Sequence, residues 1–384
     1  MGNFCGAMGL TGLSSPTPAD VTTCNLLHLE FSTLRIAVGC RKVFTVAASM
    51  LILVCLMAPE MCAATADESM SAWISRNYRD HPLVGKIWQP RTGRFVDHKR
   101  LIAQLSRSKF ILLGERHDNA DHHRLQTLVG RELFVSGQHR AVVFEMLNEG
   151  QEEGIARHRA LHPGDAATLG DAVGWSKSGW PDWSNYQPLA QIALDADTPI
   201  VPAGLPRVTL RRIARNGVEV LGQVRVTRLG LNRLPGPAIL SAIRHELIGT
   251  HCNQLPESLI DPMIRVAVVK DAVMAEALLR GTAMSKSDGA LLIAGAGHAR
   301  TDRGVPWHLR RLAPSESVAS VGFIEVDEGR ENPGDYAAPF SAASLPFDFV
   351  WFTPRHDLED PCVKFAEQLK RARERSEGGR SENR

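Results

Sequence analysis

The sequence lacks the short motifs that mark the commonest nucleotide and hydrolase sites. Its 384 residues contain no phosphate-binding loop, no GxSxG nucleophile elbow, no HExxH motif and no CxxC or CxxCH pair. Nucleotide chemistry, serine hydrolysis and cofactor attachment through paired cysteines are therefore disfavoured. A predominance of one charge is also missing, since 44 basic residues nearly balance 42 acidic ones. Because this balance gives no general attraction to nucleic acid, we expect no nucleic-acid partner.

Cysteine is scarce outside the N-terminal segment. Five of the seven cysteines lie between Cys5 and Cys62, which leaves Cys252 and Cys362 for the rest of the chain. In an oxidising compartment these two could form one disulfide that ties the middle of the chain to its C-terminal region. The alternative is two unrelated thiols, and the sequence alone leaves both open.

The N-terminal segment has the pattern of a secretory signal. Arg41 and Lys42 precede the apolar run Val43–Ala58, and Ala-x-Ala spacing follows at Ala64 and Ala66. The run is shorter than the roughly 20 residues of a membrane span, so a cleaved signal is favoured over an uncleaved anchor. We therefore predict export to the periplasm or cell envelope.

The composition along the chain predicts three parts. Residues 1–66 form an N-terminal extension with the signal peptide, residues 67–364 form one domain, and residues 365–384 form a charged, disordered tail. The first part carries Cys55 and Cys62, but neither follows the Leu-small-small pattern that favours lipid attachment. A lipid anchor is thus the less favoured alternative.

Short apolar runs alternate with helical stretches in the domain. The runs with the character of buried parallel strands are Phe110–Gly114, Ala141–Glu145, Thr198–Ala203, Ala290–Ala294 and Ser320–Val326. This alternation predicts an α/β fold with a mostly parallel sheet flanked by helices and a core at about 110–326. Phe347–Phe352 is expected to add an edge strand, and Asp67–Gly93 is expected to be a polar loop. Gly204–His251 is predicted to be a helical insertion over the sheet, with or without the role of a lid.

Ionisable side chains follow three of the predicted strands. Glu115 and His117 come after the first strand, Glu145 ends the second, and His298 lies just beyond the fourth. Because ligands of open parallel sheets bind at the carboxyl ends of the strands, we expect these four side chains to face one crevice. Carboxylate and imidazole groups can act in acid–base catalysis or hold a divalent metal ion. A structural role in ion pairs and turns is the alternative.

Glycine and arginine residues beside these groups shape the expected crevice. Gly114, Gly295 and Gly297 permit close backbone approach. Arg300 is a candidate partner for an anionic group such as a carboxylate. Further along the chain, Asp118, Asp121, His122 and His123 crowd the start of the next helix, and one of them is expected to cap it.

Aromatic residues are few, yet they gather in one loop. Trp175–Pro188 contains three of the seven tryptophans and one of the three tyrosines, and its glycine and prolines indicate a loop. Such loops can form a flat apolar wall for a planar ligand, with Trp180 and Trp183 as wall residues. Tyr186 could supply a phenolate to ferric iron. Alternatively, the rings only cover the hydrophobic core.

Taken in order, these segments resemble the ChaN-like haem-binding uptake proteins of the Tiki superfamily. The resemblance covers about Phe110 to Val326 and rests on five stretches: Leu113–Gln126, the strand end at Glu145, Gly179–Pro188, Pro202–Arg207 and Ile293–Arg300. It implies an α/β fold, a cell-envelope location and haem binding, in a homodimer that encloses cofacial haems with tyrosine ligation. Envelope transport proteins would be further partners.

The resemblance also assigns roles to residues. The cofactor-binding residues that it suggests are Tyr186, as the haem ligand, with His298, Arg300, Trp180 and Trp183. Glu115, His117, Glu145 and His298 match the superfamily's glutamate and Gly-x-x-His positions. The first hypothesis is therefore an exported haem-binding protein that contributes to haem and iron uptake. The alternative is a metal-dependent protease or esterase in which the same four residues hold Mn, Co or Zn and activate water.

Overall fold

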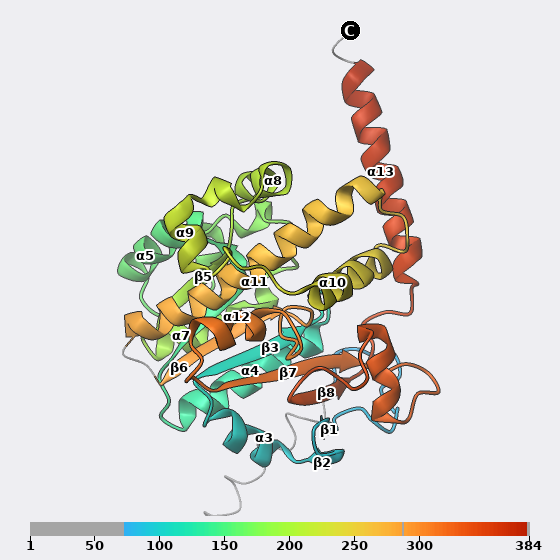
Figure 1. Cartoon of the computed structure of the whole chain (residues 1–384). Helices are drawn as coiled ribbons and strands as arrows, with labels where there is room; N and C mark the ends of the chain where they lie inside the picture. Colours follow the sequence, from blue (N-terminus) through green and yellow to red (C-terminus); the bar gives the residue numbers. More distant parts are fainter. Residues whose placement is uncertain (1–72, 286–287, 382–384) are drawn as a thin grey trace, which may run out of the picture. The chain divides into compact units, whose positions relative to one another are not determined.

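The computed structural model describes residues 73–285 and 288–381 (Figure 1). These residues belong to the compact unit Ala66–Arg384. The signal segment predicted within residues 1–66 lies outside the described residues. Within the described part of the chain, no helix is both long and apolar enough to cross a membrane.

The centre of the structure is an eight-stranded sheet with the order β2-β1-β8-β7-β3-β6-β4-β5. The strands are β1 (Ile87–Gln89), β2 (Arg94–Val96), β3 (Phe110–Glu115), β4 (Arg140–Asn148), β5 (Ile200–Gly204), β6 (Gly289–Gly295), β7 (Val318–Glu325) and β8 (Phe349–Thr353). The six strands from β8 to β5 in this order pair in parallel, whereas β1 pairs antiparallel with β2 and β8. The predicted α/β fold with a mostly parallel sheet is confirmed.

Helices cover both faces of this sheet (Figure 1). The α-helices are α3 (His98–Leu105), α4 (Ala120–Val135), α5 (Glu152–Leu161), α6 (Leu169–Ala172), α7 (Gln187–Asp195), α8 (Arg207–Asn216), α9 (Gln223–Arg228), α10 (Pro237–Thr250), α11 (Glu257–Ser285), α12 (Val305–Leu312) and α13 (Pro361–Ser381). The 3-10 helices are η1 (Glu149–Gln151), η2 (Trp175–Lys177), η3 (Trp183–Asn185), η4 (Val218–Leu221) and η5 (Pro333–Phe340). Helix α13 covers most of the stretch predicted as a disordered tail.

Alternate residues of each central strand enter two different hydrophobic cores. In β3, Ile111 joins the core that contains Leu125 of α4, whereas Leu112 joins the core that contains Met274 and Leu278 of α11. Because both faces of the strand are buried, its sequence is a continuous apolar run rather than an alternation of apolar and polar residues. This explains why the central strands were readable from the sequence.

The stretch Gly204–His251 is a helical insertion, as predicted. Its helices α8, α9 and α10 pack against α11 through a third hydrophobic core that includes Ile213, Leu229, Ile243 and Val269. The insertion therefore rests on one long helix, and α11 in turn packs on the sheet at β4, β5 and β6. Residues of α11 are thus held between the insertion and the strands.

Two expectations about the sheet edge were wrong. Strand β8, expected at an edge, pairs with β7 on one side and β1 on the other. The stretch Asp67–Gly93, expected to be a loop, supplies β1, and Arg94–Val96 supplies β2. Strands of three residues are too short to show a period of two, so they could not be recognised by pattern.

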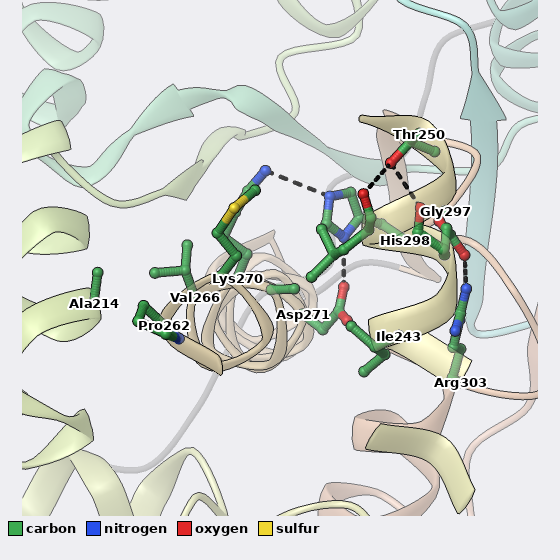
Figure 2. Close-up of a pocket in the computed structure, with 14 residues that line it drawn as sticks. Ala214, Ile243, Thr250, Pro262, Val266, Lys270, Asp271, Gly297, His298 and Arg303 are labelled. Carbon is green, nitrogen blue, oxygen red and sulfur yellow. Dashed lines mark hydrogen bonds and ion pairs between the residues drawn. The ribbon is translucent and has the colours of Figure 1, made fainter. Parts of the chain in front are cut away.

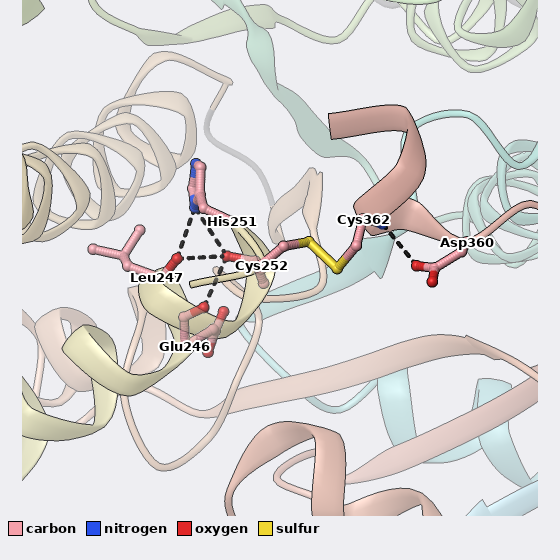
Figure 3. Close-up of a disulfide and its surroundings, with 7 residues drawn as sticks. Glu246, Leu247, His251, Cys252, Asp360 and Cys362 are labelled. Carbon is pink, nitrogen blue, oxygen red and sulfur yellow. Dashed lines mark hydrogen bonds between the residues drawn. A yellow bond between two sulfur atoms is a disulfide. The ribbon is translucent and has the colours of Figure 1, made fainter. Parts of the chain in front are cut away.

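Cys252 and Cys362 form a disulfide with their Cα atoms 5.5 Å apart (Figure 3). It links the turn after α10 to the start of α13, so of the two alternatives left open by the sequence the bonded pair is the one present. The cross-link ties the helical insertion to the C-terminal helix. Its cysteines are 110 residues apart in the sequence, and closing so long a loop restricts the unfolded chain.

Candidate functional site

The predicted crevice lies at the carboxyl ends of three adjacent strands. Strand β6 pairs with β3 on one side and with β4 on the other, and Glu115 is opposite Gly295 in the register. The end of β3 therefore lies beside the end of β6, and Glu145 of β4 approaches the same place from the other side. The expected convergence of Glu115, His117, Glu145 and His298 is found, and their functional roles stay predictions.

Glu115 is the centre of a buried group formed by Glu115, His117, His123 and Tyr186, which we call the Glu115 group. Its Oε1 lies 2.8 Å from Nδ1 of His117 and accepts a hydrogen bond from the hydroxyl of Tyr186 at 3.0 Å. Its Oε2 lies 3.0 Å from Nδ1 of His123. Burial alone would raise the pKa of Glu115, but the two imidazoles outweigh it and lower that pKa to about 2. Glu115 is thus a carboxylate.

His123 and Tyr186 complete this group from the helical layer. His123 follows the start of α4, and although burial lowers its pKa, hydrogen bonding and attraction to Glu115 raise it overall. Burial and the charge of Glu115 raise the pKa of Tyr186, so its hydroxyl keeps the proton that it donates. The cap of α4 is Asn119, not one of Asp118, Asp121, His122 or His123 as expected.

Glu145 is the centre of a second group with Lys270, Asp271 and His298, which we call the Glu145 group. Its Oε1 accepts from Nζ of Lys270 at 2.6 Å and lies 3.3 Å from Nε2 of His298. Its Oε2 accepts from the backbone N–H of Gly295 at 2.9 Å. Burial would raise the pKa of Glu145, but His298 and Lys270 hold it well below its usual value.

His298 is held between two carboxylates. Its Nδ1 lies 2.5 Å from Oδ1 of Asp271, on the opposite side of the ring from Glu145. Burial lowers the pKa of His298, but attraction to Glu145 and then to Asp271 raises it to about 9. The ring is therefore an imidazolium at neutral pH, and its charge is opposed by the nearby Lys270.

His117 connects the two groups. One ring nitrogen faces Glu115, and the other lies 4.0 Å from Oε2 of Glu145, while a third of the side chain is exposed. A Cβ at Gly295 would lie 3.0 Å from Nε2 of His117, and one at Gly114 would lie 2.9 Å from backbone and side-chain atoms of the loop after β6. The two glycines thus permit the close approach that the sequence suggested.

Lys270 and Asp271 were missed by the sequence interpretation. They lie side by side in α11, a part of the chain to which the sequence interpretation gave no functional role. The sequence did offer a signal, since Lys270 and Asp271 are two charges within the otherwise apolar stretch from Val266 to Val273. Charges are rarely buried without a partner, so such a pair indicates that each has one.

The Glu115 group and the Glu145 group together, which we call the cluster, do not suit the predicted divalent metal ion. Lys270 places an ammonium group against Glu145 and 3.4 Å from Nε2 of His298, where a metal ion would need to lie. Within the described residues, the group with atoms close enough to share an ion is Asp118, His356 and Asp357. Two of these side chains are exposed, and the two aspartates pair with Arg116 and Lys364, so we assign the group no metal either.

The aromatic loop divides into buried and accessible parts. Trp183 and Tyr186 lie in the hydrophobic core with Trp175, as in the alternative interpretation of this loop. Trp180 is only partly buried, and its ring meets the ring of His117 edge-on with centroids 4.8 Å apart. Of the two predicted wall residues, Trp180 is thus accessible beside the cluster, and Trp183 is buried. Ligation by Tyr186 stays a prediction that would require its hydroxyl to leave Glu115.

Arg300 does not join the cluster. Its guanidinium is buried and bonds Glu246 at 3.0 Å, Asp302 at 2.7 Å and the carbonyl of Phe340 at 2.9 Å. Because these partners occupy its guanidinium, Arg300 is not placed to hold an external anion, the role that the sequence suggested. Its neighbour Arg303, by contrast, lines a cavity.

Two cavities border the Glu145 group. The first, about 340 Å³, is lined by Glu145, Trp180, Lys177 and Arg207 among others. The second, also about 340 Å³, lies between α10 and α11 and reaches Lys270, Asp271 and His298 (Figure 2). Among the described residues that line these cavities, Lys270 is common to both. The cluster therefore has access to two separate spaces.

Comparison with known proteins shows the family of this chain. The sequence model of the family described as "Haem-binding uptake, Tiki superfamily, ChaN" matches residues 101–309, which is more than half of the chain. The chain belongs to this family. The matched segment runs from α3 into α12 and includes every residue of the Glu115 and Glu145 groups. No curated protein sequence matches the chain.

Solved structures resemble the ChaN-family chain in fold. ChaN of Campylobacter jejuni, described with cofacial haem, has a TM-score of 0.54 and 20% identity, over 69% of this chain and 95% of that one. The type III effector HopBA1 matches with a TM-score of 0.42 and 11% identity, over 66% of this chain and 91% of that one. At these identities the likeness to ChaN shows a shared fold.

Proposed function

We propose that this ChaN-family protein is exported to the cell envelope and binds haem without a covalent bond at the cavity beside Trp180, as a contribution to haem and iron uptake. Membership of the family supports the ligand, and the N-terminal signal pattern supports export. A homodimer and envelope transport proteins are the partners that we expect for this role. The observation that carries the proposal is the half-buried imidazole of His117, which lies between the carboxylate of Glu115 and the ring of Trp180.

The residues around this cavity fit a haem. Trp180 offers an aromatic face, Met146, Leu205 and Leu210 add apolar walls, and Lys177 and Arg207 supply cations for the propionates. Haem iron takes an axial ligand from a protein nitrogen, sulfur or oxygen atom. Such a planar ligand with an apolar body and two carboxylates matches this lining better than a nucleotide or a sugar.

We favour His117 over Tyr186 as the axial ligand. Glu115 accepts from Nδ1 of His117, which fixes the ring and leaves the Nε2 lone pair available, the arrangement common in metal-ligating histidines. Tyr186 is buried and its phenol is a donor to the same carboxylate. A phenolate beside Glu115 would place two negative charges 3.0 Å apart, as judged from the present oxygen positions.

A titration of the purified protein with ferric haem tests the proposal. We expect a saturable Soret band in the wild type. The wavelength of the band should shift in His117→Ala and should be unchanged in Tyr186→Phe. Tyr336→Phe is the matched control, since Tyr336 is buried in the other core. If Tyr186→Phe shifts the band and His117→Ala does not, tyrosine is the ligand. A protein without any saturable spectral change would remove the haem proposal.

A second candidate is hydrolysis that does not depend on a metal ion. The specific observation is that Glu115 orients the half-buried His117, while His298 and Lys270 place two cations at the same crevice. His117 could then accept a proton from water, and the cations could stabilise an oxyanion. Ester cleavage that survives chelation and is lost in His117→Gln would support this function, whereas cleavage abolished by chelation would contradict it.

A further inference from the structure

The cavity between α10 and α11 has apolar walls along most of its length. Its apolar lining includes Ile243 and Leu247 of α10, Val266 and Ala267 of α11, and Ala214 of α8. Val266 and Ala267 precede Lys270 by four and three residues, so α11 presents them on one face with the lysine. Its volume of about 340 Å³ is near the lower end for small-molecule sites.

Charged side chains also line this cavity. Figure 2 shows Lys270 and Asp271 extending from α11 toward His298, with Arg303 at a separate place in the lining. The ionisable residues that line the cavity are three cations and two carboxylates: Lys270, His298, Arg303, Glu246 and Asp271. Lys270 and His298 already pair with Glu145 and Asp271, and Glu246 is shared between Arg300 and Arg303. Among these lining residues, Arg303 is therefore the cation without a carboxylate of its own.

Arg303 is also short of hydrogen-bond acceptors. Its side chain is buried, and its Nη1 has no hydrogen-bond partner among the described residues. Its Nη2 pairs with Oε2 of Glu246, but the same oxygen also accepts from Arg300. One carboxylate oxygen thus serves two buried guanidinium groups, and Arg300 has Asp302 as well while Arg303 does not. A buried charged donor without an acceptor is costly, and a ligand acceptor would remove that cost.

We propose that this cavity binds a small amphipathic monocarboxylate, such as a short- or medium-chain fatty acid. The alkyl body lies between α10 and α11, and the carboxylate meets Nη1 of Arg303. The site is separate from the haem cavity and goes beyond haem binding. A neutral apolar molecule of the same length would leave Nη1 of Arg303 without an acceptor, and an alkylammonium would add a fourth cation.

Calorimetry on the full chain with three probes of equal length tests the proposal. We expect octanoate to bind saturably, and 1-octanol and octylammonium to bind about tenfold more weakly or worse, as the loss of a charge-assisted bond predicts. Equal binding of octanoate and 1-octanol would show that the cavity only takes up apolar chains, and would overturn the proposal.

Two kinds of variant locate the site. Arg303→Gln should weaken octanoate binding about tenfold while changing 1-octanol little. Because Arg303 is buried and the variant could fail to fold, Ala267→Phe provides a second route, since it fills the cavity without removing a charge. Leu259→Phe, at an exposed position of the same helix, is the matched control and should bind octanoate like the wild type.

The haem titration distinguishes this site from the proposed haem site. Ala267 lines the cavity between α10 and α11 and is not among the residues of the Trp180 cavity. Ala267→Phe should therefore lose octanoate and keep the haem spectrum. Unchanged octanoate binding in Ala267→Phe would contradict the assigned cavity, whatever the haem result.

Discussion

The two buried glutamates of the site occupy similar strand ends but have different surroundings. Glu115 is enclosed by imidazole and phenol groups from the loop after β3, from α4 and from the residue before α7, and it lines neither cavity. Glu145 is paired with Lys270, which borders both cavities and is about a quarter exposed. The buried Glu115 therefore orients its neighbours, whereas Glu145 and Lys270 border the cavities. His117 belongs to the Glu115 group and reaches toward the Glu145 group.

Neutralising the two glutamates should give unequal losses of stability. Glu115→Gln leaves the buried His123 without its counter-ion, and we expect a loss of about 3–5 kcal/mol in the free energy of unfolding. Glu145→Gln should cost only about 1–2 kcal/mol, because Lys270 can turn into a cavity and glutamine can still accept from Gly295. Urea unfolding at pH 7 measures both values. Equal losses would erase the proposed difference between the groups.

Glu115 should contribute most of the fall in the free energy of unfolding at acid pH. The pKa of Glu115 is lowered from 4.5 to about 2, so its contribution is complete above pH 4.5 and is lost as the pH falls toward 2. The full contribution is about 3 kcal/mol. Unfolding free energies of the wild type and Glu115→Gln, measured across this range, should converge toward pH 2. A constant difference between them would contradict the lowered pKa.

His298 of the Glu145 group should lower the free energy of unfolding as the pH becomes alkaline. The pKa of His298 is raised from 6.5 to about 9, so its stabilising contribution is complete below pH 6.5 and is lost as the pH rises toward 9. The effect should be about 2–3 kcal/mol, since the pair with Glu145 is opposed by Lys270. His298→Gln should thus differ from the wild type at pH 6 and approach it near pH 10. The opposite trend would show that His298 is neutral in the fold.

The smallest change in stability is expected at Trp180, where the two groups meet the solvent. Trp180→Leu removes a partly buried ring that contacts His117, and we expect a stability change of less than about 1 kcal/mol. Haem affinity should nevertheless fall several-fold, because the flat wall is lost. Phe95→Leu, at an exposed ring on β2, is the control and should bind haem normally. Equal haem binding in both variants would exclude Trp180 from the site.

Much of the fold and part of the site could be predicted because the relevant signals are local. The strands at Phe110 and Ala290 are buried on both faces and therefore appear as unbroken apolar runs, and glycine marks where each one turns. Asn119 was missed as the cap of α4 because several neighbouring residues have similar capping side chains. Trp183 and Trp180 look alike in the sequence, although only one of them reaches the site.

The sequence by itself determined which strand ends carry acid and imidazole groups, and that these ends belong to a parallel sheet. Only the tertiary structure decided what those groups do to one another. The lysine and aspartate of α11 reach the cluster from a helix far along the chain, and the ammonium group of Lys270 takes the place where a metal ion was expected. Long-range pairing of this kind depends on how the helices pack on the sheet, which no local pattern of residues records.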